Sequence, residues 1–153
     1  MAQGTITNFQ NFSKTISGTI ALGADVLKFA LTSTVPAASD AVPCWGAGGT
    51  TNESTNEVSA GGGYTTGGVT LGSVTWTQSG GTATLDAADP SWTSSGSGDP
   101  TNIKSGIMYS NTATNKDCIN WMDMTADGGT TAISLLSGDI NVTLNASGIM
   151  TLS

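Results

Sequence analysis

Hydrophobic and polar residues alternate along much of this chain, and that period of two is typical of β-strands. The clearest case is the segment 27–32, where Leu27, Phe29 and Leu31 alternate with Lys28, Ala30 and Thr32. Pro36 follows shortly and lacks the N–H that a strand ladder needs. This segment is therefore predicted to be a strand with one buried face.

Several later segments show the same strand pattern, and glycine-rich turns separate them. The Gly80-Gly81 pair predicts a hairpin turn, and the turn at 146–148 predicts a hairpin at the C-terminus. Ile119 and Trp121 are expected on one face of their strand, with Met122 and Met124 on the other. The strands are expected at 69–75, 82–87, 107–110, 119–124, 133–136, 140–144 and 149–152. About eight short strands with frequent turns predict a mainly β fold, a single antiparallel β-sandwich or barrel-like domain spanning 1–153.

The first twenty residues show a different period. Phe9, Phe12, Ile16 and Ile20 recur at helical spacing. They predict a short amphipathic helix over 7–17, the only helix expected. Because its helix propensity is poor, it needs support from other parts of a structure. We therefore expect 1–20 to form an arm that contacts neighbouring subunits.

Two stretches are expected to be long loops. The segment 36–63 is predicted to be an irregular connection with Cys44 and Trp45 in its middle. Trp45 would either plug the edge of the core or meet a partner. The segment 61–68 contains five glycines around Tyr64. Glycine tolerates positive φ, so this stretch predicts a shaped turn, and the Tyr64 ring is expected to face the core.

Composition narrows the possible functions. Only 10% of the 153 residues are charged. The chain has four lysines, no arginine, no histidine and eleven acidic residues, which gives a net charge of −7. It lacks the basic surface that nucleic acids or anionic membranes attract. Its hydrophobic runs are shorter than a membrane span, and its first residues do not resemble a secretion signal. We therefore expect no nucleic-acid or membrane partner and no signal-directed export.

The sequence offers little catalytic chemistry. Without histidine there is no Ser-His-Asp triad and no imidazole metal site. The acid pairs Glu53/Glu57 and Asp86/Asp89 could in principle serve glycoside hydrolysis, but such pairs are common in acidic chains. Asp123 and Asp127 lack the alternating ligands of a calcium loop. The prediction is no enzyme, no catalytic residue, no cofactor and no metal.

The two cysteines, Cys44 and Cys118, are too far apart in sequence for a CxxC motif. Two buried thiols are the first interpretation. A disulfide between them and intermolecular pairing are the alternatives.

Four segments resemble, in their order along the chain, a family of tailed-bacteriophage virion proteins. The segments are LGADVLKFALTSTVPAASDAV, NEVSAGGGYTTGGVTL, ATLDAADPSWTSSG and SGIMYSNTATNKDCINWMDM. The residues that match the family pattern are Leu22, Gly23, Asp25, Leu27, Lys28, Leu31, Thr32, Pro36, Glu57, Gly61, Gly63, Tyr64, Thr65, Gly67, Gly68, Ala88, Asp89, Pro90, Trp92, Thr93, Tyr109, Thr112, Ala113, Thr114 and Trp121. The chain departs from the pattern at 43–56, which looks like an insertion, and near the start, where the family's charged helix is missing.

Some members of this family are similar to capsid decoration, or cement, proteins. The resemblance implies a virion protein that is made in the host cytoplasm, binds the major capsid protein on the outer capsid surface, and contacts copies of itself as a dimer or trimer. Apolar anchors would make these contacts; the candidates are Phe9, Phe12, Trp45, Tyr64 and Trp92. The alternatives are a tail, collar or baseplate component of the virion, and a carbohydrate-binding or host-adhesion module.

Overall fold

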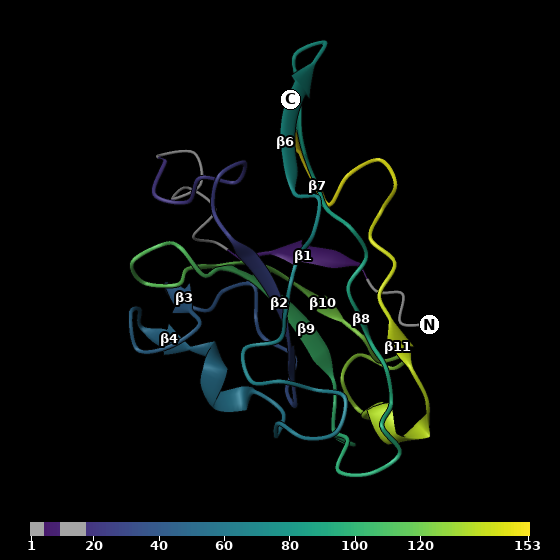
Figure 1. Cartoon of the computed structure of the whole chain (residues 1–153). Helices are drawn as coiled ribbons and strands as arrows, with labels where there is room; N and C mark the ends of the chain where they lie inside the picture. Colours follow the sequence, from purple (N-terminus) through teal and green to yellow (C-terminus); the bar gives the residue numbers. More distant parts are fainter. Residues whose placement is uncertain (1–4, 10–17) are drawn as a thin grey trace.

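The computed structural model describes residues 5–9 and 18–153 of the chain. Within these residues it is mainly β, with twelve short strands in several sheets and two 3₁₀ helices, η2 (Glu53–Asn56) and η3 (Leu135–Ser137) (Figure 1). The strands are β1 (Ile6–Asn8), β2 (Leu27–Thr32), β3 (Pro43–Cys44), β4 (Thr51–Asn52), β5 (Val69–Thr70), β6 (Thr75–Ser79), β7 (Thr82–Asp86), β8 (Ser91–Trp92), β9 (Ser105–Ser110), β10 (Cys118–Asp123), β11 (Ile140–Asn141) and β12 (Met150–Leu152). The prediction of a mainly β fold is confirmed.

The largest sheet has five strands in the order β1-β10-β9-β2-β5, and every neighbouring pair is antiparallel. Its centre is β9, which is buried along its whole length. Gly106 of β9 lies opposite Leu31 of β2. A side chain at Gly106 would collide with the Phe29 ring. Glycine at this position therefore lets the ring lie flat on the sheet, as glycine commonly does where another group comes close.

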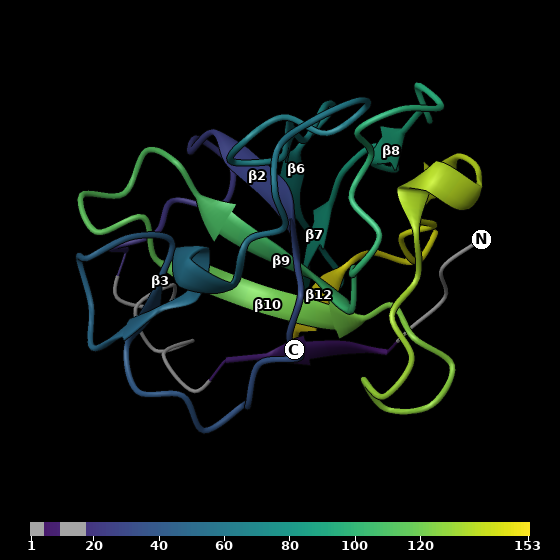
Figure 2. The same ribbon diagram turned by 90° about the horizontal axis from the view of Figure 1, so that it is seen from below.

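Both faces of this sheet are covered. On one face, Phe29 and Met108 pack in the larger core with residues of the smaller sheets, among them Leu85, Trp92 and Met150. On the other face lies a second core of six buried residues, which are Phe9, Ala30, Trp45, Ile107, Tyr109 and Cys118. The segment with β3 and β4 lies on one side of the molecule and β8 and η3 on the opposite side, with the five-stranded sheet between them (Figures 1 and 2). Since both faces are covered, the central strand β9 shows no alternation of buried and exposed residues.

The hairpin of β6 and β7, with β12 beside β7, extends away from the other strands (Figure 1). Gly80 and Gly81 form its turn with φ of 57° and 87°, as a type I′ turn requires. The predicted hairpin is therefore confirmed. With β12 it forms a separate three-stranded sheet in the order β12-β7-β6. In the described part of the chain the sheets keep open edges and do not close into a barrel.

The helix predicted over 7–17 is wrong at its start. Thr7 and Asn8 belong to β1, which pairs with Trp121 and Asn120 of β10. Phe9 follows the strand and is buried in the second core. Pairing with β10 satisfies backbone groups that a short helix of poor propensity could not hold by itself. The rest of the predicted helix, with Phe12, lies outside the described residues.

The predicted C-terminal hairpin is also wrong. β11 pairs with β8, and β12 pairs with β7. The alternation seen in the sequence is real, because Ile140, Val142 and Leu144 are buried while the residues between them are exposed. Alternation identifies the face of a strand that is buried, but it does not identify the neighbouring strand.

Three smaller expectations need correction. The strand expected at 133–136 is a single bridge from Ile133 to Ile103 followed by η3. The strand expected at 69–75 is divided between β5 and the start of β6. The segment 36–63 is less irregular than expected, because it contains β3, β4 and η2.

A β-bulge changes the faces of β10. The pairing of β10 with β9 shifts register between Cys118 and Asn120, so Ile119 is the extra residue. Ile119 therefore joins Met122 and Met124 in the larger core, whereas Trp121 packs against the second core. The expectation that Ile119 and Trp121 share a face is wrong, because a bulge interrupts the alternation on which it rests.

Candidate protein-contact surface

The aromatic residues proposed as partner anchors lie inside the chain's own core. The exposed fractions of Phe9, Trp45, Tyr64 and Trp92 are 1%, 5%, 2% and 3%. Phe12 lies outside the described residues. In this conformation the four described side chains are not available to a partner. Contact with another protein would therefore need residues other than these four.

Trp45 plugs the second core, as the first of its two interpretations predicts. Its ring stacks on Tyr109 with a centroid distance of 4.9 Å and an interplanar angle of 11°. Its backbone N–H donates to the Lys116 carbonyl at 2.8 Å. Cys44 and Cys118 are both buried and no disulfide joins them. Burial raises the pKa of the Cys118 thiol, which makes this cysteine a poor nucleophile.

The glycine-rich loop 61–68 is held to the core through Tyr64. The Tyr64 hydroxyl donates to Oε1 of Glu57 at 2.8 Å and accepts the Leu31 N–H at 3.1 Å. Oε1 of Glu57 also accepts the Gly67 N–H, and the Tyr109 hydroxyl donates to the Gly67 carbonyl at 2.9 Å. Burial raises the pKa of Tyr64 above its ordinary value. The expectations of a fixed turn and a core-facing tyrosine are confirmed.

Close backbone approach explains two of these glycines. Gly68 has φ of +70°, and a Cβ at this position would lie 2.0 Å from the Phe29 carbonyl oxygen. A Cβ at Gly63 would lie 1.9 Å from the Thr93 carbonyl oxygen. Neither position has room for a side chain. The loop is thus a packed structural element.

Asp99 joins the loop 61–68 to the loop 94–99. Its carboxylate accepts the N–H groups of Gly63, Ser95 and Gly96 and the hydroxyl of Ser94. These donors stabilise the charged form. The N–H of Gly63 contributes most to holding the pKa of Asp99 below its ordinary value. The carboxylate is therefore occupied in structural hydrogen bonds.

Glu53 is the most perturbed carboxyl group. It is 2% exposed, and its Oε1 has no hydrogen-bond partner among the described residues. Burial, followed by the charge of Asp40 and a hydrogen bond with Asp40, raises the pKa of Glu53 to about 7. A pKa in this range suits a general acid, but Glu53 lines neither the surface hollow around Met124 nor the one around Thr143. The described residues also contain no group of three or more acidic or cysteine side chains that could hold a metal ion.

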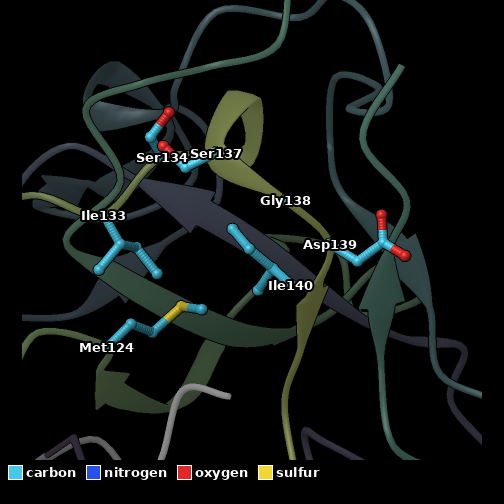
Figure 3. A pocket seen from close by; sticks show the side chains of 7 residues that line it. All are labelled: Met124, Ile133, Ser134, Ser137, Gly138, Asp139 and Ile140. Carbon is cyan, nitrogen blue, oxygen red and sulfur yellow. The ribbon is translucent and has the colours of Figure 1, made fainter. Parts of the chain in front are cut away.

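The hollows on the surface of the described residues include a smaller and a larger one. The smaller has a volume of about 200 Å³, and in Figure 3 the side chains of Met124, Ile133 and Ile140 point toward one another within it. Asp139 points away from these three (Figure 3), and its Oδ1 accepts the Ser94 N–H at 2.8 Å. The larger, of about 620 Å³, lies between the β1 end of the large sheet and the segment 143–149. The smaller hollow is also lined by Ser134, Ser137 and Asp139, whereas no acidic side chain lines the larger one.

No known protein family, curated protein or solved structure matches this chain. Among the described residues no helix is long and apolar enough to cross a membrane.

The β6–β7 hairpin presents an exposed and mostly uncharged strand. Residues 58–85 form the longest stretch of the chain without a charged side chain, and this stretch includes all of β6. The exposed large apolar residues elsewhere are scattered singly; they are Val26, Val42, Leu136 and Leu152. The sequence contained the signal for this surface, the uncharged stretch itself, but did not show that the hairpin projects.

Proposed function

We propose that this chain is a structural protein of a tailed-bacteriophage virion, a capsid decoration protein. It binds the major capsid protein on the outer surface of the head and contacts copies of itself, after synthesis in the host cytoplasm. Its role is binding rather than catalysis. The proposal rests on the resemblance of four ordered segments to such virion proteins.

The observation that carries the proposal is that these four segments contact one another. Tyr64 of the second segment hydrogen-bonds the backbone of Leu31 in the first. Its ring centroid lies 6.4 Å from that of Trp92 in the third segment. Tyr109 of the fourth segment donates to the Gly67 carbonyl in the second. The segments that carry the resemblance therefore lie together around one core.

The fourth segment also contacts the first. The Ser110 hydroxyl lies 2.6 Å from Oδ2 of Asp25, and the Val26 N–H donates to the Thr112 hydroxyl oxygen at 2.8 Å. Asp25 and Thr112 both belong to the family pattern. We infer that the pattern records a shared framework, and that the finer arrangement is a β-sandwich in which the smaller sheets pack on the large one.

Charge supports an outer location. The net charge of −7 disfavours contact with packaged DNA, since a negative surface repels phosphate groups. It also keeps the protein soluble before assembly. Trp45 and Trp92 are buried and cannot stack on a sugar, so only the half-buried Trp76 and Trp121 could serve the carbohydrate-binding alternative.

Two experiments test the proposal, a count of the copies of this protein per virion and a measurement of its binding to heads that lack it. Quantitative mass spectrometry of purified virions of the phage that encodes this chain should find hundreds of copies per particle. Heads produced without this gene should bind the purified protein in a sedimentation assay and become more resistant to heat. Tens of copies per virion, with no binding to heads, would favour the tail, collar or baseplate alternative.

A further inference from the structure

The β6 strand is an open edge on a projecting hairpin. In the described part of the chain β6 pairs only with β7 and lies at the end of the order β12-β7-β6. Thr75, Thr77, Gln78 and Ser79 are exposed, and only Trp76 is half-buried. Figure 1 shows the hairpin extending beyond the other strands. An edge in this position can be reached by another molecule.

The register shows which backbone groups face outward. Ser79 pairs with Thr82 across the two-residue Gly80-Gly81 turn, and such a turn makes this closing pair a hydrogen-bonded one. Hydrogen-bonded and non-hydrogen-bonded pairs alternate in antiparallel strands. Thr75, Thr77 and Ser79 therefore direct their backbone groups toward β7. The N–H and C=O groups of Trp76 and Gln78 point to the open side.

The features that usually protect such an edge are missing from β6. Its sequence, TWTQS, has no lysine and no proline, and its pairing with β7 runs without a bulge. Natural proteins use charges, proline or bulges to prevent pairing between edge strands. A regular and unprotected edge is thus open to strand addition.

Charge indicates what could pair with it. Two copies of the chain, each with a net charge of −7, repel one another over most of their surface. The stretch 58–85 carries no charge, so two copies can approach closely there. This argument favours a second copy over an unrelated partner, which would have no need of a neutral edge.

We propose that two copies of this chain pair through β6, antiparallel, around a two-fold axis at Thr77. Trp76 of each copy lies opposite Gln78 of the other, and these two pairs exchange four backbone hydrogen bonds. The two Thr77 side chains face each other in the central, non-hydrogen-bonded pair. The result is a continuous six-stranded sheet with a closed, isologous interface.

This inference deepens the proposed function, because it names the contact between copies. It is tested on the isolated full-length protein, so its failure differs from failure of head binding. A monomeric protein that still binds heads would overturn the β6 dimer alone. A β6 dimer that does not bind heads would overturn the decoration role alone.

The first measurement combines sedimentation with amide hydrogen exchange over a range of protein concentrations. We expect a monomer–dimer equilibrium, because a single strand pair buries less area than a standard stable interface. The amides of Trp76 and Gln78 should exchange rapidly in the monomer and slow at least about tenfold when the dimer predominates, because they then donate hydrogen bonds. A protein that stays monomeric up to about 1 mM would have a dimer dissociation constant weaker than about 1 mM. That result would overturn the inference.

The second measurement uses charge at the two-fold axis. Thr77→Lys and Thr77→Glu each place like charges opposite one another across the interface, which is destabilising. Each variant alone should raise the dimer dissociation constant at least about tenfold, equivalent to roughly 1.4 kcal/mol. An equimolar mixture should restore association as a heterodimer. Failure of the mixture to associate would contradict the predicted register.

Thr151→Lys is the matched control. Thr151 is exposed on β12 at the opposite edge of the same sheet and pairs with Thr84. It receives the same added charge as Thr77→Lys and should leave the dissociation constant within about twofold of wild type, since surface substitutions away from the contact have small effects. An equal loss for both lysine variants would show that β6 is not the specific contact. Circular dichroism confirms that each variant is folded.

Discussion

The Tyr64 hydroxyl donates a hydrogen bond to Glu57 at 2.8 Å while it accepts the Leu31 N–H at 3.1 Å. One buried oxygen thus joins the glycine-rich loop to a carboxylate and to the central sheet. Tyr64→Phe should lower the free energy of unfolding by about 1–3 kcal/mol, because the Leu31 N–H loses its partner in a buried site. Tyr64→Ala should lower it by roughly 3–5 kcal/mol, since the ring is lost as well.

Urea denaturation followed by intrinsic fluorescence provides the measurement. Thr151→Ala, at an exposed position on β12, is the control and should change the free energy by no more than about 0.5 kcal/mol. Equal midpoints for wild type, Tyr64→Phe and Tyr64→Ala would mean that the loop does not contribute to stability.

Alanine substitutions at two glycines with positive φ distinguish the cost of a strained backbone from the cost of a steric clash. Gly68 and Gly80 have φ of +70° and +57°, but only Gly68 would place a Cβ against backbone atoms, 2.0 Å from the Phe29 carbonyl oxygen. Gly80→Ala should cost about 1 kcal/mol from conformation alone. Gly68→Ala should cost roughly 1–3 kcal/mol more because of overpacking. Thermal melting measures both, and equal losses would contradict the close approach at Gly68.

Glu53 predicts that stability decreases as the pH rises. Its pKa in the folded protein is about 7, above the ordinary value of 4.5, so folding favours the protonated form. The contribution of Glu53 to the free energy of unfolding is complete below about pH 4.5 and is lost as the pH rises through about 7. The melting temperature should therefore fall by a few degrees between pH 5 and pH 8, measured in buffers of equal ionic strength.

Glu53→Gln tests whether this group is responsible. The amide stays neutral at every pH, so the variant should lose the decline between pH 5 and pH 8 and melt above wild type at pH 8. If the decline is unchanged in Glu53→Gln, another group causes it.

The lowered pKa of Asp99 predicts that stability decreases as the pH falls at the acidic end of the range. Hydrogen bonds from Gly63 and its neighbours lower the pKa of this carboxyl group, so folding favours the charged form. Its contribution is complete above the ordinary pKa of about 3.8 and is lost as the pH falls through the lower folded value. Asp99→Asn should melt several degrees below wild type at pH 7, because an amide replaces one acceptor oxygen with a donor.

The difference between wild type and Asp99→Asn should shrink as the pH falls below about 4. Differential scanning calorimetry at a series of pH values measures it. A difference that stays constant down to pH 2 would show that the charge of Asp99 is not what the loop requires.

The sequence by itself determined where local structure forms. Alternation located β2 and β10, because a strand with one face on a core must place every second side chain inward. The Gly80-Gly81 pair located the β6–β7 hairpin, because few residues other than glycine tolerate two consecutive positive φ angles. The Tyr64 ring among five glycines pointed to a packed turn, since an isolated exposed ring would have little to hold it. These are properties of neighbouring residues.

Only the tertiary structure decided the pairings and the faces. Whether β11 pairs with β12 or with β8 depends on contacts that are distant in the sequence, and no local period encodes the partner. The bulge at Ile119 reversed a face that alternation had assigned. Thr7 and Asn8 pair with β10 instead of starting a helix, and Trp45 and Trp92, possible anchors by composition, fill cores assembled from distant segments.

The candidate interface at β6 also depends partly on the sequence alone and partly on the tertiary structure. The uncharged stretch 58–85 and the hairpin turn are visible in the sequence. That β7 receives β12 on its second side, which leaves β6 as an open edge, is a result of long-range pairing. The physical reason is that secondary structure follows from local periodicity and turn geometry, whereas an exposed edge exists only once every other strand has found its neighbour.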